Sequence, residues 1–147
     1  MKPQLLEKVK SIIEKRMDTS WQAMEAAKNS ANEEGKSSAG DKYETARAMG
    51  QLDREMNGRM YEQAHHERLL LDKIDPQIIF SKVTFGALVE TSMGIFFVTI
   101  GVGVVEFEDK KIMAISPQSP IGQAIAGKGI GETFDFRSKK QEIIAII

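Results

Sequence analysis

Apolar residues in the first half of the chain recur at three- and four-residue steps, as a helix that buries one stripe requires. One series covers residues 5–31, and a second covers residues 43–74. Residues 35–40, between them, are rich in Gly and Ser, which cluster where helices end, and Asp41 or Gly40 can cap a following helix. The pattern predicts two antiparallel helices of roughly 30 residues each. The second stripe would consist of Tyr43, Ala46, Met49, Leu52, Met56, Met60, Leu70 and Ile74.

The seam expected between these helices is rich in Ala and Met and is interrupted by polar residues and by Gly50 and Gly58. A glycine inside a helix costs about 1 kcal/mol relative to alanine. Small residues let helices approach closely, and Met packs without demanding one geometry. Two interpretations remain open: the outer surface and tip of the hairpin matter more than its core, or the pair is only marginally stable and docks on something else.

The second half is rich in Val, Ile and Phe, which favour strands. We expect Gly86 to mark a bulge or a close approach. The charged residues 108–111 form a plausible hairpin turn, and a last hairpin would turn near residues 138–140. The predicted strands are residues 83–89, 95–100, 105–107 and 112–115, followed by the hairpin within residues 134–147.

A short helix is expected after the fourth of these strands. Ser119 is a natural N-cap and Pro120 a natural first helical residue, so the helix would run through Ala126 and end at Gly127. A sheet with one short helix, preceded by a helical hairpin, indicates an α+β protein.

Composition divides the chain at the same place as the pattern. The first 74 residues carry 13 basic and 13 acidic side chains, whereas the remaining 73 carry 7 and 8. Asp75 precedes Pro76, and a residue before proline is biased away from the helical region. We therefore predict two domains, a helical hairpin or coiled coil over residues 1–74 with its tip near residues 33–42, and a sheet domain over residues 75–147.

Several classes of function are excluded or disfavoured by composition. The 147 residues contain no Cys, which excludes disulfides, thiolate zinc sites, iron-sulfur clusters and Cys nucleophiles. A net charge of −1 supplies no general drive toward nucleic acid, so we expect no direct DNA binding. The longest nearly apolar stretch, residues 93–105, is too short to span a bilayer, and the first residues do not resemble a secretory signal. We expect a cytoplasmic monomer without membrane contact.

No metal site or catalytic constellation of its own is predicted. His65 and His66 are adjacent and therefore point to different sides of a helix, whereas two metal ligands on one helix are typically four residues apart. Trp21 lies near Met17 and Met24, which favours a packing role.

Two segments carry a resemblance to a known family. Residues 31–47 align without gaps on a tip pattern at Ala31, Glu33, Gly35, Tyr43, Ala46 and Arg47. Residues 115–128 match a segment in which Ser119 and Pro120 are followed by Ile121 and later by Gly127 and Lys128. In this order, the two halves resemble the bacterial Gre transcript-cleavage factors over most of the chain.

The resemblance implies an antiparallel coiled coil that inserts into the secondary channel of RNA polymerase. It also implies an FKBP-like C-terminal domain that docks at the channel entrance through Ser119, Pro120 and Ile121. The family uses two acidic residues at the coiled-coil tip to help hold the second magnesium ion and activate water. Carboxylates suit this role because Mg²⁺ is a hard cation that prefers oxygen ligands, and the metal ion activates its bound water as the nucleophile.

This chain departs from the family at those acidic positions. Lys36 stands where the aspartate after the tip glycine is expected, and Ala39 where the partner glutamate is expected. A lysine cannot bind Mg²⁺ as a ligand, and its charge opposes binding of a second dication. The remaining candidate ligands are Glu33, Glu34 and Asp41. The other tip residues are Gly35, Lys36, Ala39, Gly40 and Tyr43.

Three functions follow as alternatives. The first is a Gre-like elongation regulator that binds polymerase without strong cleavage activity; it would be no enzyme itself and have no cofactor of its own. The second is an active cleavage factor that uses the remaining tip carboxylates with the Mg²⁺ of polymerase. The third is a chaperone or scaffold unrelated to transcription, against which the lack of a visible aromatic cluster in the sheet half argues.

Overall fold

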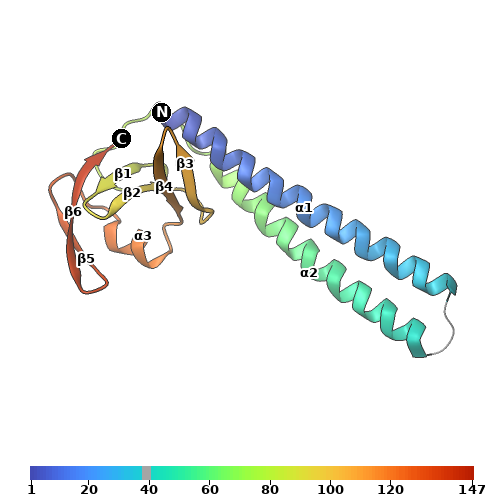
Figure 1. The fold of residues 1–147 in the computed structure, drawn as a ribbon. Helices are drawn as coiled ribbons and strands as arrows, with labels where there is room; N and C mark the ends of the chain where they lie inside the picture. The colour runs from blue at the N-terminus through green and yellow to red at the C-terminus, as the bar shows by residue number, and fades with distance from the viewer. Residues whose placement is uncertain (38–40) are drawn as a thin grey trace. The chain divides into compact units, whose positions relative to one another are not determined.

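Two long helices form the first half of the chain. The computed structural model describes residues 1–37 and 41–147, and the side chains of residues 30–44 and 46 lie outside this description. Helix α1 covers Lys2–Ser37 and helix α2 covers Asp41–Leu71. They run in opposite directions (Figure 1), so the predicted antiparallel pair is confirmed. The first helix extends through Ser37, beyond the predicted end at Gly35. Every helix within the described residues is too short or too polar to traverse a bilayer.

The protein divides into two compact units. One contains Met1–Ile12 and Leu69–Ile147, and the other contains Ile13–Arg68. This division differs from the change in composition at Asp75, because the first turns of α1 make contacts with the sheet half. The Nζ atom of Lys8 donates to the Glu106 carbonyl at 2.5 Å and lies 5.8 Å from the centre of the Phe107 ring.

Lys2 makes the second contact of this kind. Its Nζ atom donates to the Ile78 carbonyl at 2.9 Å and lies 4.6 Å from the centre of the Phe80 ring. Burial lowers the pKa of the Lys2 ammonium, and the Asp75 carboxylate opposes part of this shift. The hydrogen bond and the ring offset part of the desolvation cost of a cation that is only 4% exposed.

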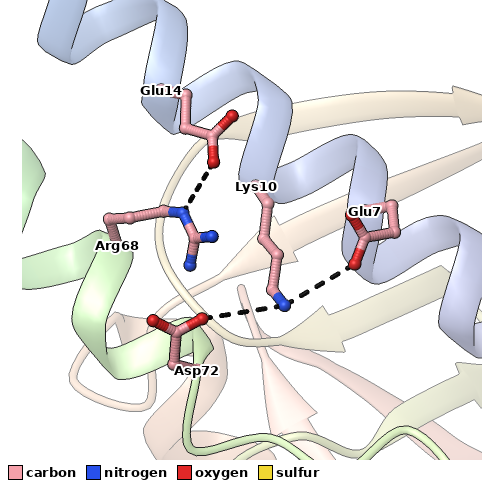
Figure 2. A network of polar contacts seen from close by, with 5 residues as sticks. All are labelled: Glu7, Lys10, Glu14, Arg68 and Asp72. Atoms are coloured by element: carbon pink, nitrogen blue, oxygen red, sulfur yellow. Dashed lines mark hydrogen bonds and ion pairs between the residues drawn. The ribbon is translucent and has the colours of Figure 1, made fainter.

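Exposed ion pairs connect α1 with the C-terminal end of α2 and the residue after it. Figure 2 shows Lys10 between two carboxylates of its unit, at 3.6 Å from Glu7 and 3.8 Å from Asp72. In the other unit, Arg68 Nε donates to Glu14 Oε1 at 2.9 Å. Exposed pairs of this type contribute about 0–1 kcal/mol each, so they adjust the alignment of the helices more than they stabilise it.

Small and aromatic residues make the contact between the helices in the unit Ile13–Arg68. The rings of Trp21 and Tyr61 lie 5.4 Å apart, so Trp21 contacts the neighbouring helix as predicted, although it stays 47% exposed. A methyl group added at Gly58 would lie 3.6 Å from the sulfur of Met24. The helices therefore meet through one aromatic pair and, at Gly58, through a small residue that lets them approach closely.

The packed face of α2 differs from the predicted stripe. Met49, Leu52, Met56 and Met60 are 50–64% exposed, although their spacing predicted burial. Ala64 is buried instead, and Gly58 and Tyr61 are partly buried. The prediction was wrong at these four positions, whereas Ile74 of the predicted stripe is buried and Leu70 is partly buried. A helix can present two stripes, and around Gly58 the one that contacts α1 is not the one with the methionines. The outer face of α2 consequently carries a row of exposed Met and Leu side chains.

The second half forms a mixed six-stranded sheet with one short helix (Figure 1). The strand order is β3-β4-β2-β1-β6-β5, and only the β2–β4 pair is parallel among those assigned. The elements are β1 Leu88–Thr91, β2 Gly94–Val98, β3 Gly103–Phe107, β4 Lys110–Ile115, α3 Pro120–Ile125, β5 Thr133–Phe136 and β6 Lys139–Ile146. The predicted α+β class is confirmed, whereas the FKBP-like character of this half stays a prediction.

One core lies on the face of the sheet that α3 covers. Alternate strand residues point into it, as period-two patterning requires. Its buried members are Val83, Ala87, Val89, Phe96, Val98, Ile115, Ile121, Ile125, Phe134, Ile143 and Ile146. The neighbouring strand residues Leu88, Phe97 and Ile112 are buried on the opposite face.

The first predicted strand, residues 83–89, begins later than expected. Strand β1 starts at Leu88, because Gly86 has φ +92° and breaks the extended run. A Cβ atom at Gly86 would lie 3.3 Å from Ile74, so the predicted close approach at this glycine is confirmed. The two predicted hairpin turns are confirmed as well: Glu108 and Asp109 join β3 to β4, and Arg137 and Ser138 join β5 to β6.

The substitution Gly58→Ala should stabilise the helix pair by about 1 kcal/mol, because alanine favours a helix and its methyl group makes an ordinary contact with Met24. Gly58→Leu should destabilise the pair, since the larger side chain cannot fit between the helices. Urea unfolding followed by circular dichroism measures both effects. A loss of stability in Gly58→Ala would show that the helices approach more closely than described.

Candidate functional site

The predicted polymerase-binding segment is a tight turn that opens helix α3. Ser119 is its N-cap with φ −64° and ψ 157°, and Pro120 is the first helical residue, as predicted. The Ser119 hydroxyl donates to the Ser116 carbonyl at 2.7 Å and accepts from the Gly122 amide at 3.1 Å. An N-cap side chain of this type stabilises a helix by about 1 kcal/mol. The helix ends at Ile125, one residue before the predicted end.

Gly122 allows this turn to close. An added Cβ atom would lie 2.3 Å from the Ser116 carbonyl oxygen and 2.9 Å from the Pro117 carbonyl oxygen. The carbonyls of residues 116 and 117 occupy the space of a side chain, so only glycine fits. This packing determines where Pro120 lies.

The three predicted binding residues have different environments. Pro120 is exposed and Ser119 is half-buried. Ile121 is only 7% exposed and belongs to the core of the sheet unit. Pro120 is therefore the most accessible of the three side chains, whereas Ile121 anchors the turn in the core.

An open groove of about 470 Å³ lies beside this turn. Its walls include Pro120 and Ile121 together with residues from the four strands β2, β3, β4 and β5 and from two hairpin turns. Phe96, Met113 and Val104 are aligned across β2, β4 and β3 by the strand register, and all three line the groove. The remaining lining residues are Met93, Gly94, Ile95, Lys111, Phe136 and Arg137.

The groove is apolar and accessible. Val104 on β3 is 54% exposed and Met113 beside it on β4 is 42% exposed, and Met93 in the β1–β2 turn is 38% exposed. Together they give the groove exposed apolar walls. The structure also brings Phe96 and Phe136 from separate hairpins to the same groove. The sheet half thus contains an aromatic pair that the sequence does not reveal, because the two residues lie 40 positions apart.

Both charged residues that line the groove are cations. Lys111 lies on β4, and Arg137 lies in the β5–β6 turn with its guanidinium 5.3 Å from the centre of the Phe136 ring. Glu106 is the cross-strand partner of Lys111 but does not line the groove. The groove therefore combines an apolar floor with a basic border.

Sequence reasoning found Pro120 and Ile121 but missed the rest of the groove. A signal was present in β4, where residues 112–115 are all apolar, so that both faces of the strand are apolar. Ile112 is buried on one face, whereas Met113 is left half-exposed on the other.

The predicted tip of the helical hairpin cannot be compared in the same way. Lys36 and the three candidate carboxylates belong to the residues whose side chains lie outside the described part of the chain. The affected positions are Glu33, Glu34, Gly35, Lys36, Ala39, Gly40, Asp41 and Tyr43.

No group of three or more His, Asp or Glu residues within the described part of the chain could hold a metal ion. His65 and His66 are both exposed, and the ring of His65 stacks on Tyr61 at 6.1 Å between centres. The histidines therefore take part in the outer surface of the helix pair.

Comparison with known proteins adds a distant structural likeness. No protein-family model matches the sequence, and no curated protein matches it either. Among solved structures, one described as that of the transcription factor Gfh1 is 16% identical, with an alignment that covers 93% of this chain and 92% of that chain and a TM-score of 0.37. A likeness this weak supports no statement about fold or function, which rest on the features described above.

The substitution Gly122→Ala should destabilise the sheet unit by about 3 kcal/mol, because the new methyl group would overlap the Ser116 carbonyl. Gly101→Ala is the matched control, since no atom lies within 4 Å of the added methyl group there, and it should change stability by less than about 0.5 kcal/mol. Thermal unfolding of both variants measures the difference. Equal melting temperatures would refute the close packing of this turn.

Proposed function

We propose that this protein is a Gre-like regulator of transcription elongation. It binds RNA polymerase through Pro120 and the groove beside it, and it places the helical hairpin in the secondary channel. It acts as a regulator and is not itself an enzyme, because its tip sequence lacks the pair of carboxylates that the resemblance calls for.

One observation carries the proposal. The segment that resembles the family's Ser-Pro motif is a rigid, capped turn that presents an exposed proline at the border of an open apolar groove. Exposed apolar surface bordered by polar residues is typical of protein contact sites. The motif therefore coincides with a surface suited to a protein partner, and not with a buried structural turn.

The helix pair supports the same function. Met49, Leu52, Met56 and Met60 form an exposed row on the outer face of α2. Methionine adapts to irregular surfaces and is frequent where proteins contact one another. An outer face of this kind suits a hairpin enclosed by protein walls better than one surrounded by water.

The tip sequence argues for regulation without strong cleavage. Lys36 and Ala39 occupy the positions at which the family carries its carboxylates. Second-metal chemistry needs anionic oxygen ligands, and a lysine ammonium repels the metal. Any magnesium in the reaction would belong to polymerase.

Binding to purified RNA polymerase should depend on the groove. Pro120→Asp and Met113→Glu place a carboxylate on exposed parts of an apolar surface, so each should weaken binding by about tenfold or more, equivalent to about 1.4 kcal/mol. Ile121→Asp is unsuitable, since its carboxylate would lie in the core. Binding is measured by biolayer interferometry with immobilised polymerase.

Ile79→Glu is the control for this experiment, because Ile79 is 76% exposed and does not line the groove. It should bind polymerase as the unchanged protein does. No association of the intact protein would refute the proposed function. If the protein then prevents aggregation of a denatured client, the chaperone alternative replaces it.

Backtracked elongation complexes with Mg²⁺ should release 3′ RNA fragments no faster with this protein than without it. The double variant Lys36→Asp/Ala39→Glu restores the carboxylates of the family pattern and should accelerate release by about tenfold or more, which lowers the barrier by about 1.4 kcal/mol. Rapid release with the unchanged protein, abolished by Glu34→Gln or Asp41→Asn, would instead establish the active cleavage factor.

A further inference from the structure

The groove beside Pro120 reaches the edge of the sheet. Strand β3 is the first strand in the sheet order, so one of its sides has no neighbouring strand within the described residues. Val104 lies on this strand, and its side chain lines the groove. A ligand in the groove would therefore lie next to the backbone of an open sheet edge.

The backbone of Val104 faces outward at this edge. The Glu106 carbonyl accepts a hydrogen bond from Lys8 and does not point toward β4. Backbone groups alternate in direction along a strand, so the N–H and C=O of Val104, two residues away, point outward as well. An extended peptide segment could pair with Val104, which is strand addition to a sheet edge. Its side chains on the groove side would then lie over Val104 and next to Met113 on the neighbouring strand.

The charged residues at the border of the groove favour a ligand with negative charge. Lys111 and Arg137 are the charged residues of the groove, and no carboxylate lines it. The positive charge of Lys111 is partly balanced by Glu106 across the strand pair, whereas Arg137 contacts the face of Phe136. Carboxylates of a ligand would therefore be attracted to this border, most strongly near Arg137, and ammonium groups would be repelled.

We propose that the groove binds an extended segment of the partner protein in which apolar side chains are flanked by carboxylates. The segment pairs with the outer edge of β3, its apolar side chains cover Val104 and Met113, and its carboxylates are attracted to Lys111 and Arg137 at the border of the groove. This inference rests on the proposed function, since it names the chemistry by which polymerase would be recognised at Pro120. A small-molecule ligand fits less well, because such sites enclose most of their ligand and this groove is open.

The test uses three short fluorescein-labelled peptides and the full chain. The first peptide has a central Leu-Phe pair flanked by Asp and Glu, the second has Lys in place of the acidic residues, and the third has Ser in place of Leu and Phe. Fluorescence anisotropy should show that the first binds at least about tenfold more tightly than either of the others. Amide chemical shifts in a ¹⁵N-labelled sample should change at Val104 and around the groove.

Matched variants locate the site. Arg137→Glu and Met113→Glu should each weaken binding of the acidic apolar peptide by about tenfold, and Lys111→Glu should weaken it less, because Glu106 already offsets that charge. Lys82→Glu and Ile79→Glu make the same changes of charge and polarity outside the groove and should leave binding unchanged. Circular dichroism of each variant confirms that it is folded.

Equal affinity for the acidic and basic peptides, or shift changes that avoid β3, would overturn the inference. Tighter binding of octanoate than of the peptide would overturn it as well, in favour of a small carboxylate ligand. If the peptide binds as expected but polymerase does not, the proposed function fails while the chemistry of the groove stands. If polymerase binds through Pro120 but no peptide does, the proposed function stands and this inference fails.

Discussion

The close packing at Gly122 is the constraint on which the candidate site depends. The carbonyls of residues 116 and 117 fill the space where a side chain would lie, and the Ser119 hydroxyl bridges the turn by accepting from the Gly122 amide. This packing fixes the orientation of the first turn of α3. As a result, Ile121 enters the core while Pro120 stays at the surface. A larger residue at position 122 would change both positions at once.

The parallel pairing of β2 with β4 is the second requirement of the site. It places Phe96 beside Met113, and the β3–β4 hairpin places Val104 beside Met113 in turn. These residues come from three separate strands and form one apolar row beside the capped turn. Met113 and Val104 stay exposed while Phe96 is buried, because α3 has only six residues and covers the sheet over part of its face. A short helix thus creates the groove by leaving part of the sheet open.

The helix pair follows a different principle from the sheet. Its contact surface uses small residues and one aromatic pair, with Met24 close to Gly58, while larger apolar side chains of α2 face outward. Such a pair gains little free energy from burial, because its largest apolar groups stay in contact with solvent. Under the proposed function, these groups are covered only when a partner surrounds the hairpin. The unit is therefore organised for its outer surface as much as for its own stability.

How much could be predicted from the sequence depends on the range of the interactions involved. Helices, hairpin turns and the Ser119 cap follow from patterns within a few residues, and all of them were predicted with small errors at their ends. The start of β1 was misplaced, because the effect of Gly86 depends on contact with Ile74 and Phe80. The burial of Met56 was predicted wrongly, because periodicity alone does not say which of two stripes meets the neighbouring helix.

The sequence by itself determined the α+β class, the capped Ser119-Pro120 turn and the absence of the two expected carboxylates at Lys36 and Ala39. Only the tertiary structure decided that Ile121 is a core residue, that Phe96 and Phe136 line one groove, and that the border of this groove is basic. The physical reason is the distance along the chain. Caps and periodic patterns are local, whereas a groove forms only when strand register and helix packing bring together residues that no local pattern connects.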